Sequence, residues 1–100
     1  MKLYIVKYCA NEYDDLGYES PYPIYYSLNE NKARNFFEMK RVEEIDNFNN
    51  YMSRHPELQN NEDYCIEKNS TDELEYNFGK WFYKYIFYED ELEKDLRYNN

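Results

Sequence analysis

Histidine, cysteine and glycine, on which many nucleophilic, metal-binding and phosphate-binding sites depend, are scarce in this chain of 100 residues. Its only histidine, His55, precedes a proline at a predicted helix end, where a favourable charge at the helix C-terminus explains it better than catalysis does. Cys9 and Cys65 lack the CxxC spacing and the second histidine of a zinc or cysteine-nucleophile site. In a reducing cytosol we expect two buried thiols rather than a disulfide. Two glycines cannot form a phosphate-binding loop. The sequence therefore predicts a protein that is not an enzyme and holds no cofactor or metal.

Carboxylates are the abundant chemistry, with 21 Asp and Glu against 12 Lys and Arg and a net charge of −9. On helices they would form rows at i, i+4 spacing, which imitate backbone phosphates and can occupy a cationic groove meant for nucleic acid. A simpler explanation of the same runs is a solvated face that keeps a small protein soluble. Two clusters lack a local structural reason and are candidate partner-binding residues: Glu89, Asp90, Glu91, Glu93 and Asp95, and Glu43, Glu44 and Asp46.

Aromatic residues are the second unusual feature, since 21 of the 100 residues are aromatic and 14 of these are tyrosine. Acidic disordered segments are poor in aromatic residues, so this content predicts a folded chain. A core of this size cannot enclose so many rings, and exposed tyrosines are typical of interfaces. We expect Tyr83 and Tyr98 to flank the acidic surface as partner-binding anchors. The tyrosines that we expect to be exposed are Tyr13, Tyr18, Tyr22, Tyr25, Tyr83 and Tyr98.

The elements that position these residues are predicted within a single domain over 1–100. Alternation and β-forming residues predict a strand over 2–10, and a turn-rich loop leads to a second strand over 24–28. Tyr64-Cys65-Ile66-Glu67 predicts a short third strand.

Two helices are predicted to pack on this sheet. The capping box Ser27-Leu28-Asn29-Glu30 begins the first, which continues to about Met52 and is closed by His55-Pro56. Apolar spacing favours a second helix from Thr71 to about Arg97, although Gly79 argues against it. In the alternative, 80–88 is a strand and only 89–97 is helical. The expected fold class is thus α+β, with a small antiparallel sheet of about three strands packed by two helices.

The charge of the chain excludes several partners. A chain this acidic is repelled by DNA, RNA and anionic membrane surfaces. The first residues are too short an apolar run for a signal peptide, and no stretch of about 18 apolar residues could span a bilayer. We expect a cytoplasmic protein whose partner is neutral or basic, and a homodimer remains open.

The chain is small, acidic and rich in Tyr, Asn and Lys, and it opens with MKLYIVKY, followed by a second expected strand and then SLNENKARNFF. In these features it resembles the short α+β proteins encoded by bacteriophages and mobile elements of low-GC bacteria. The resemblance covers residues 2–40. It is to a general class of proteins and not to one defined family, so it assigns no role to any individual residue. Some of those proteins, the anti-CRISPR and other anti-defence inhibitors, act by acidic mimicry of nucleic acid or by plugging a protein groove.

The sequence and this resemblance together predict a non-enzymatic phage-type inhibitor in the host cytoplasm. It would bind the basic nucleic-acid-binding surface of a host defence or DNA-processing protein through its carboxylates. Two alternatives remain. One is an aromatic-lined sponge for a nucleotide or signal molecule, in which Lys80 and Lys84 would bind a phosphate. The other is a structural or replication accessory subunit of a phage.

Overall fold

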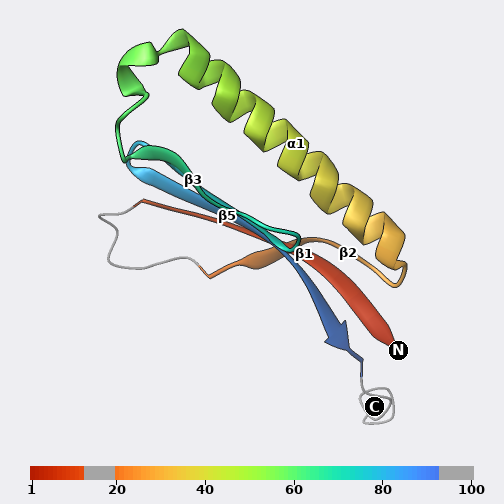
Figure 1. Cartoon of the computed structure of the whole chain (residues 1–100). Coiled ribbons are helices and arrows are strands. Elements are labelled where there is room, and N and C mark those ends of the chain that lie inside the picture. Colours follow the sequence, from red (N-terminus) through yellow and green to blue (C-terminus); the bar gives the residue numbers. More distant parts are fainter. Residues whose placement is uncertain (13–19, 93–100) are drawn as a thin grey trace.

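The computed structural model describes residues 1–12 and 20–92 of the chain. Within them all five strands form one antiparallel sheet in the order β2-β1-β5-β4-β3, and the single long helix lies across one face of it (Figure 1). The elements in chain order are β1 (Lys2–Glu12), β2 (Tyr22–Ser27), α1 (Glu30–Arg54), the 3-10 turn η1 (Pro56–Leu58), β3 (Tyr64–Asn69), β4 (Glu73–Phe78) and β5 (Trp81–Glu91).

The centre of the sheet is the long pairing of β1 with β5. Its register places Val6 opposite Phe87 and Tyr8 opposite Tyr85. Because side chains alternate along a strand, these residues share the face that α1 covers, and Leu74 of β4 joins them there. Val6 and Leu74 are fully buried, so this face of the sheet forms the floor of the core.

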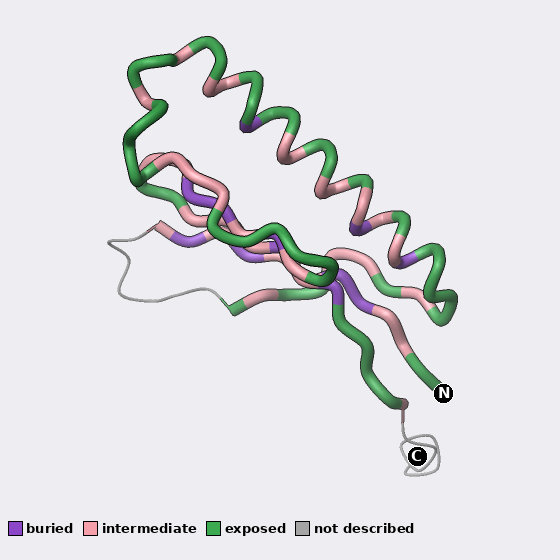
Figure 2. The backbone as a smooth tube through the Cα atoms, viewed as in Figure 1, coloured by how far each residue is buried: buried purple, intermediate pink, exposed green. Residues whose placement is uncertain are grey.

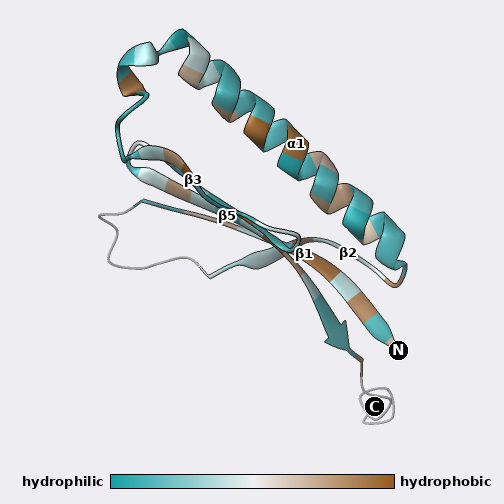
Figure 3. Cartoon of the chain, in the orientation of Figure 1, coloured by the Kyte–Doolittle hydropathy of each residue, from teal (hydrophilic) through white to brown (hydrophobic). Residues whose placement is uncertain are grey.

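Helix α1 contributes the other layer through Ala33, Phe37 and Phe48, which are buried and lie on one face of the helix. Figure 2 shows the buried positions of α1 turned toward the sheet, and Figure 3 shows that most of the helix surface is hydrophilic. The exposed side of α1 nevertheless carries two apolar residues, Met39 and Val42. The buried positions of α1 therefore lie on one face, between Ala33 and Phe48.

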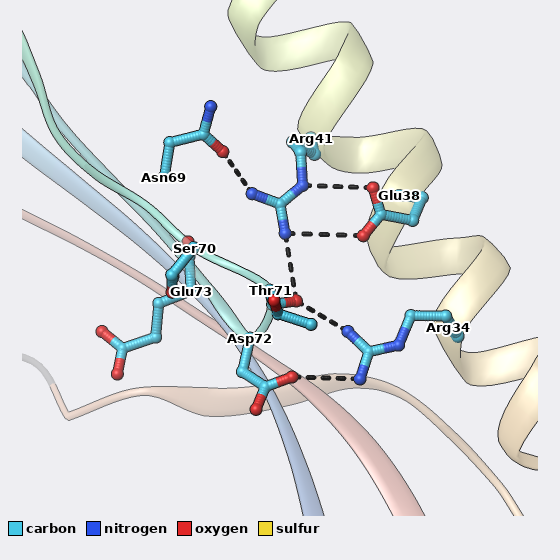
Figure 4. Close-up of polar contacts among 8 residues, drawn as sticks. All are labelled: Arg34, Glu38, Arg41, Asn69, Ser70, Thr71, Asp72 and Glu73. Carbon is cyan, nitrogen blue, oxygen red and sulfur yellow. Dashed lines mark hydrogen bonds and ion pairs between the residues drawn. The ribbon is translucent and has the colours of Figure 1, made fainter.

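Two arginines, seven residues apart on α1, attach the helix to the turn between β3 and β4 (Figure 4). The guanidinium groups of Arg34 and Arg41 both donate to the carbonyl oxygen of Thr71, at 2.7 and 3.1 Å. Arg34 also forms an ion pair with Asp72 at 3.0 Å, and Arg41 donates to the side chain of Asn69. These contacts fix where α1 lies over the sheet.

The prediction of a second helix from Thr71 to about Arg97 is wrong, and so is the expected sheet of three strands under two helices. Residues 73–78 and 81–91 are the strands β4 and β5, joined by a tight turn at Gly79, whose φ of 68° is in the left-handed region that favours glycine. The spacing resembled that of a helix because β5 has apolar residues on both faces, Tyr85 on one and Ile86 on the other. Of the alternative, the strand over 80–88 is confirmed, but the helix expected over 89–97 is wrong for residues 89–91, which continue β5, and residues 93–97 lie outside the described residues.

The remaining elements follow the sequence-based predictions closely. The strands expected over 2–10, 24–28 and 64–67 are β1, β2 and β3, and the first helix is continuous to Arg54 with His55 as its C-cap. The helix begins as expected, but its cap is Asn29, whose side chain accepts from the backbone N–H of Lys32. Ser27 instead accepts from the backbone N–H of Asn29, at 2.9 Å, so the predicted capping box is wrong.

Cys9 and Cys65 form no disulfide, as predicted from the sequence. Cys9 lies on β1 and Cys65 on β3, with β5 and β4 between these strands. Three interstrand spacings amount to roughly 14 Å, which is too far for a disulfide. Cys9 is buried and Cys65 half-buried, and burial raises the pKa of the Cys65 thiol.

Candidate functional site

The larger predicted acidic cluster lies at the end of a strand, not on a helix. Glu89, Asp90 and Glu91 are exposed at the end of β5, where alternation turns Asp90 to the face opposite Glu89 and Glu91. The carboxylate of Glu89 lies 3.4 Å from Nζ of Lys2, and that of Glu91 lies 3.0 Å from the amino group of Met1. The predicted carboxylate row along one helix face is therefore wrong. Outside the described residues lie Glu93, Asp95 and Tyr98.

The second cluster does lie on helix α1, and its members face different surroundings. Glu43 and Asp46 are exposed. Glu44 is turned toward the sheet, where its two carboxylate oxygens accept hydrogen bonds from the hydroxyls of Tyr76 and Tyr85, each at 2.7 Å. Burial raises the pKa of both tyrosines, and the hydrogen bond to Glu44 raises it further. Glu44 is thus a carboxylate held in place by two neutral phenols.

Glu44 lines a groove of about 460 Å³ between the C-terminal half of α1 and the strands β1, β4 and β5. A volume of this size is typical of sites for small molecules or for an inserted side chain. Six aromatic rings line it: Tyr8, Phe48, Tyr51, Tyr76, Phe78 and Tyr83. The polar side chains of its lining are Glu44, Asn47, Asn50 and Arg54, all from α1.

The aromatic rings that line the groove pack against one another. Tyr76 stacks on Tyr83 with centroids 5.0 Å apart, and Phe48 meets the edge of Tyr76 at 6.0 Å. Farther along, Tyr51 and Phe78 form an edge contact at 4.6 Å. Such contacts, and the fixed strands that carry three of these rings, make the aromatic walls a preformed surface.

The groove has an acidic end and a basic end. At the acidic end burial and the charges of nearby groups, Glu44 among them, raise the pKa of Tyr8 to about 12, and burial and Glu44 raise that of Tyr83. Arg54 lies ten residues further along α1, or about 15 Å along the helix axis, and its Nε donates to the carbonyl oxygen of Asn50 at 3.3 Å.

The tyrosines expected to be exposed have different environments. Tyr22 is exposed, Tyr83 lines the groove, and Tyr25 is half-buried with its ring stacked on Phe36 at 4.5 Å. Tyr26, which the sequence did not single out, is 69% exposed. Outside the described residues lie Tyr13, Tyr18 and Tyr98.

The sequence-based prediction missed Tyr8, Tyr76 and Tyr85 as parts of a site. The alternation of residues 81–88 could have identified Tyr85 and Tyr83 as partners on one face, once this segment is taken as a strand.

The two lysines proposed to hold a phosphate are not at the groove. Alternation places Lys84 on the sheet face opposite Tyr83, where its Nζ lies 4.0 Å from Glu73 and 3.9 Å from Glu75. Lys80 lies in the turn between β4 and β5. The cation that lines the groove is instead Arg54.

Across residues 1–12 and 20–92, no group of three or more His, Cys, Asp or Glu side chains is arranged to hold a metal ion. No helix in these two ranges combines the length and apolar character that a membrane span requires. The chain matches no protein-family model, no curated protein and no solved structure.

Proposed function

We propose that the protein is a non-enzymatic inhibitor that binds the basic nucleic-acid-binding surface of a host defence or DNA-processing protein. The observation that supports this most directly is the acidic turn of α1 at the aromatic groove. Glu44 faces into the groove, while Glu43 and Asp46 are exposed on the same turn of the helix. A concave aromatic surface with a carboxylate inside it, together with two exposed carboxylates on the same helical turn, is complementary to a basic protein surface.

The overall charge supports the same proposal. A net charge of −9 repels nucleic acid and attracts proteins that bind it, and charge of this size accelerates association with an oppositely charged partner. Within this proposal the cluster at the end of β5 has the smaller role, because Glu89 and Glu91 already pair with Lys2 and the amino group of Met1. The α1 turn is the surface to test first.

The test is capture of partners from a host lysate at low and high salt, followed by competition of the captured protein with duplex DNA. We expect capture of a nucleic-acid-binding protein that high salt weakens and that DNA displaces. The charge reversals Glu43→Lys and Asp46→Lys together should weaken capture by about tenfold or more.

The matched control is Glu57→Lys with Glu62→Lys, which makes the same change in net charge on exposed residues away from the groove. Equal effects of the two double variants would mean that only overall charge matters. Capture that neither salt nor DNA affects would refute the proposal.

One alternative function has a specific observation in its favour. Six rings together with Arg54 suit a nucleotide whose base stacks in the groove and whose phosphate meets the guanidinium, whereas the carboxylate of Glu44 opposes a phosphate. A thermal-shift screen against nucleotides separates the two functions. A ligand at about a hundred times its Kd stabilises a protein by roughly 2.7 kcal/mol, so only the nucleotide-binding function predicts a clear shift.

A further inference from the structure

The acidic end of the groove has the features of an organic-cation site. We propose that it binds the guanidinium group of an arginine side chain presented by the basic partner. This inference rests on the proposed function and names the chemical group that would anchor it.

The aromatic walls supply the first requirement of such a site. Tyr8, Tyr76 and Tyr83 line the groove, and Tyr76 and Tyr83 stack on each other as one continuous wall. The face of an aromatic ring carries partial negative charge and attracts a cation within about 6 Å of its centre. Arginine suits this surface better than lysine, because its planar guanidinium stacks on rings and is more weakly hydrated than an ammonium group.

Glu44 supplies the second requirement, a counter-charge inside the site. Its carboxylate is oriented by hydrogen bonds of 2.7 Å from Tyr76 and from Tyr85, so binding does not have to order it. Glu44 lines the same groove as Tyr8 and Tyr83, so its charge faces the space that the guanidinium would occupy, and it adds to the effect of burial in raising the pKa of both tyrosines. The occupant is therefore a cation and not a neutral ring.

Four aromatic rings outside the groove, those of Phe36, Phe37, Phe87 and Tyr88, already have a cation of this chain over them. Arg34 lies 3.7 Å from the ring centroid of Phe87, and Arg41 lies 4.8 Å from that of Phe37. Among the residues that the structure describes, none of the six groove rings has a Lys or Arg group over its face. Arg54 lies at the opposite end and donates to a backbone carbonyl, so within the described residues the half-buried rings of Tyr8 and Tyr83 near Glu44 have no cation over them.

The direct test is an NMR titration of the isotopically labelled protein with N-acetylarginine amide. The control ligand is N-acetylcitrulline amide, which has nearly the same shape and no charge. We expect weak, saturable shifts at the side-chain amides of Asn47 and Asn50 with the arginine ligand alone. Equal shifts with citrulline, or none with arginine, would overturn the proposal.

Matched variants assign the binding to Glu44. Glu44→Gln should weaken it by about tenfold or more, because a charge-assisted contact is lost, while Glu43→Gln removes the same charge from the exposed neighbour and should leave it nearly unchanged. Glu44→Gln also disturbs two hydrogen bonds and could weaken binding by destabilising the fold. A second pair of variants, one of which should bind more tightly, does not depend on how well Glu44→Gln folds.

Asn47→Asp adds a carboxylate to the groove and should tighten binding of the arginine ligand several-fold. Asn49→Asp adds it to an exposed residue outside the groove lining and should not. Arg54→Gln should also tighten it. Equal behaviour of the two aspartate variants would refute a site at the groove.

These experiments also separate this inference from the proposed function. Salt-sensitive, DNA-displaced capture that is indifferent to Glu44→Gln and Asn47→Asp would retain the inhibitor and reject the arginine site. Arginine binding that follows the variants, without capture of any nucleic-acid-binding protein, would retain the site and reject the inhibitor.

Discussion

Alkaline pH should destabilise this protein through the two phenols that hold Glu44. Tyr76 and Tyr85 are 8% and 6% exposed, and each donates to the same carboxylate. Burial raises the pKa of each above its ordinary value of 10.0, and the hydrogen bond to Glu44 raises it further, because a phenolate there would be both desolvated and beside a carboxylate. In the unfolded chain both hydroxyls titrate at the ordinary value.

The sign and size of the effect follow from this difference. Above pH 10 the unfolded state has released protons that the folded state still binds, so the free energy of unfolding falls as pH rises. The stabilisation is complete below pH 10 and is lost progressively toward the raised pKa of the folded state. Each tyrosine contributes a slope of about 1.4 kcal/mol per pH unit, so the two together remove roughly 3 kcal/mol by about pH 11. That is a large share of a typical stability of 5–15 kcal/mol.

The measurement is urea unfolding followed by circular dichroism between about pH 8 and pH 11. Tyr76→Phe and Tyr85→Phe should each lower stability at pH 8 by about 1.5–3 kcal/mol, because Glu44 loses a hydrogen bond. Each should also remove about 1.4 kcal/mol per pH unit from the alkaline slope, to which Tyr8 and Tyr83 contribute as well. Tyr26→Phe is the control, since its ring is 69% exposed and outside the Glu44 network. If the double phenylalanine variant kept the slope of the unmodified protein, the reasoning would be wrong.

Three further predictions concern the core, the turn between β4 and β5, and the ion pair between α1 and the sheet. Phe37→Ala should lower the free energy of urea unfolding by about 3–5 kcal/mol, because Phe37 is fully buried between α1 and the sheet, and a loss under about 1 kcal/mol would contradict this packing. Gly79→Ala should cost roughly 1–2 kcal/mol, since φ is 68° and the new Cβ would lie 3.1 Å from the hydroxyl of Tyr64; an unchanged Tm would show that the turn is different. Asp72→Asn breaks an exposed ion pair with Arg34 and should cost less than about 1 kcal/mol, measurable at low salt and absent at high salt.

Local pattern was sufficient for the first half of the fold. Alternation and β-forming residues predicted β1, and helical spacing with His55-Pro56 at its end predicted α1. The second half failed because the spacing of its apolar residues fits two kinds of element. β5 lies between β1 and β4, and the apolar residues on its two faces produce a spacing that is also typical of a helix. Which strands lie beside it depends on contacts between residues more than 70 positions apart, such as Val6 and Phe87.

Some features of the candidate site likewise follow from the sequence, and others follow only from the tertiary structure. By itself the sequence determined the acidic charge, the surplus of tyrosine and the position of Glu43, Glu44 and Asp46 on one helical turn, since these depend on composition and local spacing. Only the tertiary structure decided that Glu44 alone among them turns inward. Its hydrogen-bond donors, Tyr76 and Tyr85, lie 32 and 41 residues away and meet it because β4 and β5 pair beneath α1. A groove exists where distant elements pack together, so its walls and its charge follow from strand order and helix placement.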